Sequence, residues 1–143
     1  MAIRPLIAAA IVSTLSVGCA PQAGISTEAL PATKAFQLTP TFTKVVEDGL
    51  RSGLKDPDSA RFGSFQATQQ LTKDNQPSEE ITVCGTVNAK NSYGGYVGQQ
   101  PFIGMIVKDV NGKYVFVPTG MGSTQGDIFA IRTMCKQHGM DSA

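Results

Sequence analysis

A short apolar run near the start of the chain constrains everything that follows it. Residues 6–18 read LIAAAIVSTLSVG and carry no charge, and Arg4 precedes them. A helix of these thirteen residues is roughly 20 Å long, well short of the ~30 Å hydrocarbon core of a bilayer. A positive start, a short apolar segment and small residues before a break are typical of a secretory signal. We therefore expect residues 1–18 to be a signal peptide and the remainder to fold outside the cytoplasm.

Cys19 stands where this run ends, in the sequence SVGC. The small Gly18 before it resembles the lipobox of bacterial lipoproteins, although Ser16 occupies the place that usually holds leucine. Cleavage before Cys19 would leave a cysteine that carries a diacylglycerol thioether and an acylated amino group. The alternative is ordinary secretory cleavage near Cys19, but Pro21 would then follow the cut, and a proline fits the extended strand that a protease binds poorly.

The lipidated form would hold the protein on a membrane through its fatty chains. One buried CH₂ contributes about 0.8 kcal/mol and a single chain binds only marginally, so two or three chains are needed for a firm anchor. Ala20, rather than aspartate, follows Cys19 and resembles the sorting signal for the outer membrane. The expected location is the cell envelope, at the outer membrane and facing the periplasm.

Two cysteines remain for the folded part, Cys84 and Cys135. In an oxidising compartment, two core-facing cysteines form a disulfide, and this pair would close a loop of about fifty residues. The alternatives are a reactive thiol and two free buried thiols. The chain has no C-x-x-C motif, and its one histidine, His138, lies only three residues after Cys135.

Charge excludes one large class of function. The chain has twelve basic and eleven acidic side chains, and loss of Arg4 with the signal leaves the two classes equal. A neutral protein without a basic cluster lacks the electrostatic surface that nucleic acids require. The roughly 125 residues after the signal are enough for one domain.

The mature chain divides into a tether and a single domain. Residues 19–38 are rich in Ala, Pro and Thr without a sustained apolar period, and predict a flexible tether. The domain of residues 39–143 opens with an amphipathic helix, capped by Thr39 or Thr41 and ended at Asp56-Pro57. Its apolar stripe consists of Phe42, Val45, Val46, Leu50 and Leu54.

Strand patterns follow, and a second helix closes the domain. We expect strands around residues 62–71, 80–90, 101–109 and 113–118, with Asn111-Gly112 as a hairpin turn between the last two. Residues 127–139 predict the C-terminal helix. The expected fold class is α+β: an N-terminal amphipathic helix, a three- to four-stranded antiparallel sheet and a C-terminal helix. A disulfide from Cys84 to Cys135 would join that helix to the sheet.

The segment of residues 88–102, NAKNSYGGYVGQQPF, is the richest candidate for binding. It places Tyr93 and Tyr96 on either side of Gly94 and Gly95. Rigid aromatic faces on an adaptable loop suit contact with a peptide or a sugar. The alternative is a connection whose glycines only make turns and whose tyrosines pack back on the domain.

Other segments that suggest chemistry have simpler explanations. The glycine-rich residues 120–127 match no phosphate-binding spacing and predict a turn and a helix cap from Thr124 or Asp127. Asp56 and Asp58 flank a proline, as in ordinary turns, and a lone histidine cannot build the usual zinc site. We therefore expect no catalytic residue, no metal site and no cofactor.

Two segments carry a resemblance. LKDPDSARF, followed by VCGTVNAKNSYGGYVGQQPF, resembles a family of small exported bacterial proteins that includes lipoproteins. The similarity covers residues 45–102 and implies an envelope location and a domain that extends to Cys135. It implies no activity.

These expectations together describe a non-enzymatic envelope lipoprotein. A disulfide-joined α+β domain on a tether would present the loop of Tyr93 and Tyr96 to an envelope protein or to peptidoglycan. One alternative is an inhibitor of a hydrolase such as lysozyme, and another is a hydrolase that uses Asp56 and Asp58.

Overall fold

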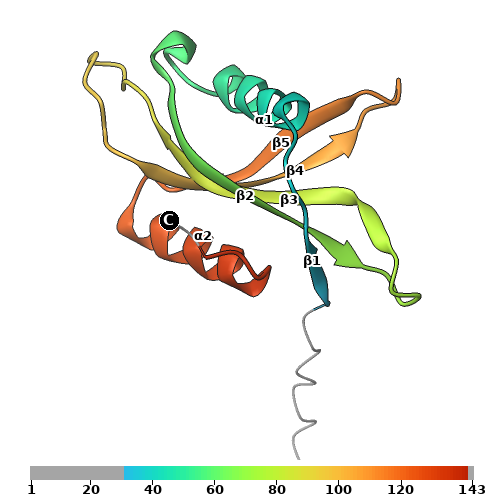
Figure 1. The fold of residues 1–143 in the computed structure, drawn as a ribbon. Coiled ribbons are helices and arrows are strands. Elements are labelled where there is room, and N and C mark those ends of the chain that lie inside the picture. Colours follow the sequence, from blue (N-terminus) through green and yellow to red (C-terminus); the bar gives the residue numbers. More distant parts are fainter. Residues whose placement is uncertain (1–30, 142–143) are drawn as a thin grey trace, which may run out of the picture.

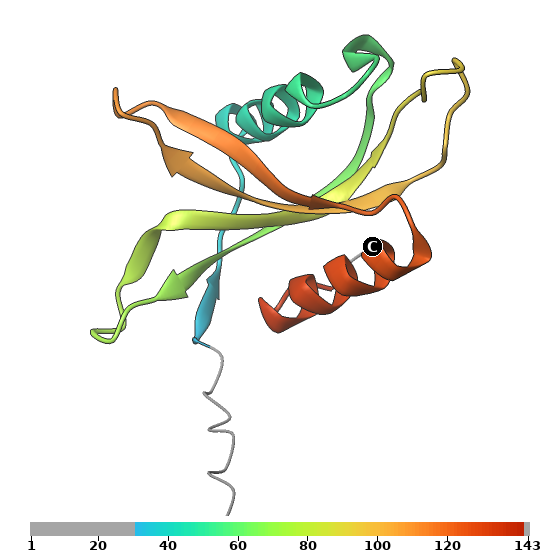
Figure 2. The same ribbon diagram turned by 180° about the vertical axis from the view of Figure 1, so that it is seen from behind.

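The computed structural model describes residues 31–141, so the predicted signal peptide and Cys19 lie outside the described residues. The helices and strands, in chain order, are β1 Thr33–Ala35, α1 Pro40–Ser52, the 3-10 turn η1 Pro57–Ser59, β2 Arg61–Leu71, β3 Pro77–Asn88, β4 Gln100–Lys108, β5 Tyr114–Met121 and α2 Gln125–Gln137. The strands form one sheet in the order β1-β2-β3-β4-β5, and all neighbours are antiparallel. The strongly twisted sheet has α1 on one face and α2 on the other (Figures 1 and 2).

The α+β class is confirmed, but the sheet has five strands rather than three or four. The additional strand, β1, falls within residues 19–38, for which the sequence predicts a flexible tether. Its three residues add to the edge of β2, with Lys34 opposite Gln69, and Phe36 and Leu38 then pack against the core. The folded domain therefore includes residues before the predicted boundary at 39.

Helix α1 begins as its sequence predicts, but it ends at Ser52, with Gly53 as its C-cap, rather than at Asp56-Pro57. The Thr39 hydroxyl caps it by accepting from the amide of Phe42 at 3.4 Å, and Pro40 occupies its first turn. The apolar stripe packs on the sheet, with Val46 and Leu50 fully buried. At Gly49 the helix comes so close to β5 that an added Cβ would lie 2.7 Å from the carbonyl oxygen of Phe116.

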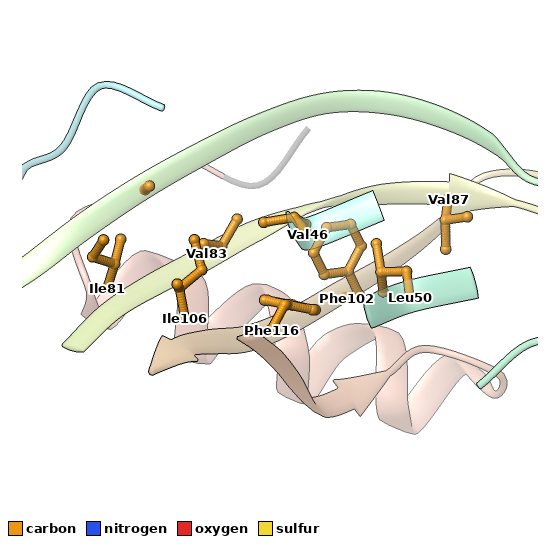
Figure 3. Close-up of a cluster of buried hydrophobic side chains, with 9 residues drawn as sticks. Val46, Leu50, Ile81, Val83, Val87, Phe102, Ile106 and Phe116 are labelled. Atoms are coloured by element: carbon orange, nitrogen blue, oxygen red, sulfur yellow. The ribbon is translucent and has the colours of Figure 1, made fainter. Parts of the chain in front are cut away.

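Alternation along the strands separates two cores. On β3, Ile81, Val83 and Val87 point to the α1 side, where Figure 3 shows them with Phe102 and Leu50. Cys84 points to the other side. The smaller core on that side consists of Cys84, Ile103, Ile131, Cys135 and Met140.

A disulfide joins Cys84 on β3 to Cys135 on α2, as the sequence predicts. The two Cα atoms are 6.1 Å apart across 51 residues of sequence, and both side chains are buried. Helix α2 also packs through Ile131 against Ile103 and Gly120, so it contacts β4 and β5 as well as β3. One part of that face stays uncovered.

The sheet is irregular along the part of β2 that β1 does not cover and along the edge strand β5. On β2, Gly63 and Ser64 lie opposite Thr86 in a bulge. An added Cβ at Gly63 would clash with the Thr86 hydroxyl. On β5, Pro118 lacks a backbone N–H, and the register shifts beside it. Bulges and prolines hinder the addition of another strand to a sheet edge.

Candidate functional site

The connection between β3 and β4, residues 89–99, folds on itself around Asn91. The Asn91 side-chain oxygen accepts from the amides of Tyr93 at 2.9 Å and Gly95 at 3.2 Å, and its carbonyl accepts from Gly94 at 3.0 Å. Gly94 has a φ of 80°, in the region that glycine enters without strain. The loop thus has a defined shape, built by an asparagine that the sequence analysis did not single out.

The two tyrosines of this loop have different surroundings. Tyr93 projects into solvent, with 97% of its surface exposed, whereas Tyr96 is 39% exposed. The guanidinium carbon of Arg61 lies 4.3 Å from the centre of the Tyr96 ring, and the Lys90 ammonium lies 5.7 Å from it. Cations at these distances are attracted to the face of an aromatic ring. Tyr96 therefore packs back on the domain, and Tyr93 does not.

The two segments that carry the family resemblance meet at this place. The Ser59 hydroxyl accepts a hydrogen bond from the Lys90 amide at 2.9 Å, across 31 residues of sequence. Figure 1 shows η1 and the β3–β4 loop at the same end of the sheet. We call this end, residues 56–61 and 88–98, the tip.

Asp56 and Asp58 make a turn in the tip rather than an acid–base pair. The Asp56 carboxylate accepts from the Ser59 amide at 3.3 Å and caps η1, while Asp58 faces solvent. The Pro57 carbonyl accepts from the Arg51 guanidinium, which also lies 4.8 Å from the centre of the Phe62 ring. These contacts fix the base of the tip from the α1 side.

The other residues that sequence suggests for chemistry lie away from the tip. Thr124 and Asp127 form the predicted cap of α2, each side chain bonding the backbone amide of the other residue. The Thr124 hydroxyl, with Ser123, lowers the pKa of the Asp127 carboxyl. His138 ends α2 on the other face of the sheet, where its carbonyl accepts from Thr33 at 3.3 Å.

Two of the grooves on the surface of residues 31–141 lie on opposite faces of the sheet. One, of about 520 Å³, runs between α1 and β2 and is lined by Phe36, Leu38, Glu47, Phe62 and Phe65. The other, of about 260 Å³, lies beside α2, and its lining includes Met105, Met134 and His138. Within the described part of the chain, no three His, Cys, Asp or Glu side chains gather where they could hold a metal ion. None of the helices formed by residues 31–141 is long and apolar enough to cross a membrane.

Comparisons with family models, with curated proteins and with solved structures find no match for this chain. The tip must therefore be interpreted from its own geometry. Sequence reasoning selected Tyr93, Gly94, Gly95 and Tyr96, but it missed the residues that hold them. These are Ser59, Arg61, Lys90 and Asn91, and no local sequence pattern pairs Ser59 with Lys90 or Arg61 with Tyr96.

Proposed function

We propose that this protein is a non-enzymatic binding module of the bacterial envelope, anchored by lipid on Cys19, and that its tip contacts the partner. The observation that carries this proposal is the exposure of Tyr93 on a loop whose backbone is already fixed by Asn91. An aromatic ring on a preorganised loop loses little conformational freedom on binding. Little of the free energy gained from its contacts is therefore lost to the entropy cost of ordering the loop.

The surroundings of Tyr93 indicate the chemistry of the partner. Arg61 and Lys90 place positive charge over the neighbouring Tyr96 ring, while the Asn91 side chain and the Gly95 amide are bonded to each other within the loop. An aromatic face next to cations suits a flat apolar surface that carries carboxylates. An envelope protein and peptidoglycan, with its sugar rings and its peptide carboxylates, both offer such a surface.

Partner capture with two tip variants tests the proposal. Purified protein is incubated with isolated peptidoglycan sacculi and, separately, with detergent-solubilised envelope proteins. The double variant Tyr93→Ala and Tyr96→Ala should lose capture, while Val110→Ala should keep it. Val110 is an equally exposed apolar residue in the β4–β5 turn, at the opposite end of the sheet.

The arm in which capture occurs identifies the class of partner. Equal capture by the wild type and the double variant, in both arms, would disprove the role of the tip. If the wild type instead slows lysozyme turnover and Tyr93→Ala does not, the tip serves as a hydrolase inhibitor. Intact-mass measurement of the membrane-extracted protein tests the anchor, because acylation of Cys19 adds the mass of its fatty chains.

A further inference from the structure

The sheet face that carries α2 is covered by this helix only in part. Ile103 lies in the core beneath α2, so strict alternation along β4 places Met105 and Val107 on the same face. Their partners on β5 are Val117 and Val115, which the register puts directly opposite. We call these four residues the open face. Val117 is 44% exposed, which is unusual for a valine with apolar neighbours on two sides.

A groove lies beside α2, and Met105 of the open face is part of its lining. Its apolar lining comes from Ile103, Met105 and Met134. The other residues that line it are polar: Gln70, Ser78, Glu80, Thr82, Thr119 and His138. Met134 is 39% exposed. Methionines on both sides make the groove adaptable, because an unbranched thioether side chain fits irregular shapes.

Helix α2 itself presents an apolar side chain outward. Phe129 is two residues from Ile131, which is buried against the sheet, so helical geometry places Phe129 on the opposite side. It is 74% exposed. The same chain therefore carries an apolar projection and a groove with apolar side chains in its lining, and no residue of the described part of the chain covers either.

Charges on this side are complementary as well. The exposed surface of α2 carries Arg132 and Lys136, and its one acid, Asp127, is engaged in the helix cap. On the strands, Glu80 lies at the rim of the groove and forms no ion pair with any described residue. The exposed surface of α2 is thus positive and the rim of the groove is negative, so a partner that contacts both needs charges of both signs.

We propose that a second copy of this chain covers the open face. In a two-fold pair, α2 of each copy lies along the groove of the other, with Phe129 against Val117 and its neighbours. Lys136 and Arg132 of each copy then approach Glu80 of the other. Such a contact is isologous, because the same residues of each copy take part in it. The open face, the groove and Phe129 of both copies are therefore covered by one interface. The tip lies away from this surface, so the pair can present two tips to one partner (Figure 2).

Sedimentation velocity of the full chain tests the pair, with Cys19→Ser as the background so that neither lipid nor a third thiol drives association. We expect a reversible dimer at micromolar concentrations. Val117→Glu and Phe129→Ser should each raise the dimer Kd by at least about tenfold, because each puts a polar group into an apolar contact. The matched control Val110→Glu adds the same charge at an equally exposed valine outside the contact, and should leave Kd unchanged.

A charge exchange makes the test specific to the proposed geometry. Glu80→Lys should weaken the dimer, and Lys136→Glu in the same chain should restore it. Thermal melts of every variant establish that the domain remains folded. A wild type that stays monomeric up to about 200 µM would overturn the proposal, and so would a dimer that Val117→Glu leaves intact. Binding to lipid vesicles that Phe129→Ser abolishes, without a dimer, would assign the surface to a membrane instead.

Discussion

The Ser59 hydroxyl accepts a hydrogen bond from the backbone amide of Lys90, and this contact, together with the packing of Arg61 on Tyr96, joins the two halves of the tip. The hydroxyl and the amide are both partly buried. Ser59 is also held by the Asp56 carbonyl, which accepts from its hydroxyl at 2.8 Å. The turn that follows α1 therefore helps to fix the position of the β3–β4 loop.

Ser59→Ala should loosen the tip without unfolding the domain. The variant leaves the Lys90 amide without its partner, which costs about 1–3 kcal/mol for a buried donor and less where water can replace the hydroxyl. Amide hydrogen exchange should speed up for residues 90–98 while β4 remains protected. Ser64→Ala, at an exposed serine of β2, is the control, and an equal effect of both changes would show that Ser59 does not position the loop.

The close approach of α1 to β5 predicts a contrast between two glycines of one helix. Gly49→Ala would place a Cβ 2.7 Å from the Phe116 carbonyl oxygen, and backbone cannot move aside as a side chain can. We expect a loss of about 1–3 kcal/mol in the free energy of unfolding, measured by urea titration.

Gly53→Ala is the matched control for this change. The nearest atom to an added Cβ there is 3.7 Å away, and φ is −97°, which alanine adopts freely. The free energy of unfolding of Gly53→Ala should be unchanged or slightly higher than that of the wild type, because alanine allows the unfolded chain fewer backbone conformations than glycine does. Equal destabilisation by both changes would contradict the proposed helix–sheet contact.

The sequence is sufficient to predict those elements whose cause is local. The cap of Thr39, the capping box of Thr124 and Asp127, and the hairpin at Gly112, which has a φ of 76°, all depend on residues within a few positions. The two faces of β3 follow from alternation, which places Cys84 and Val83 on different faces of the sheet. This placement agrees with the predicted disulfide to α2.

What could not be predicted depends on distant residues. Strand β1 has three residues and pairs through its backbone, so it leaves no apolar pattern to recognise. The contact of Arg61 with Tyr96 spans 35 positions, and neither residue type indicates the other. Fold class was therefore accessible from sequence, whereas the residues that position the candidate site required the structure.

Removal of the disulfide should destabilise the domain by about 4 kcal/mol if chain entropy dominates, given the sequence separation of 51 between the two cysteines. The variant is Cys84→Ala together with Cys135→Ala, since a single change would leave a free thiol. Urea titration measures the loss. Hydrogen exchange should rise most in α2, which the bond fastens to β3, and least in the tip. Faster exchange in the tip than in α2 would contradict this division.

Acid should weaken the start of α2 in a defined direction. Hydrogen bonds from Thr124 and Ser123 lower the pKa of Asp127 below the value of about 3.8 expected for an unfolded chain. A carboxyl whose pKa is lower in the folded state contributes stability above the unfolded value and loses it as pH falls through the folded value. Asp127→Asn removes this titration, so the difference in urea midpoint between wild type and variant should shrink as pH falls below the unfolded pKa. Asp58→Asn, at an exposed carboxylate in the η1 turn, is the control, and a wild-type advantage that persisted undiminished at the lowest pH would contradict the role of the Asp127 carboxylate in the cap.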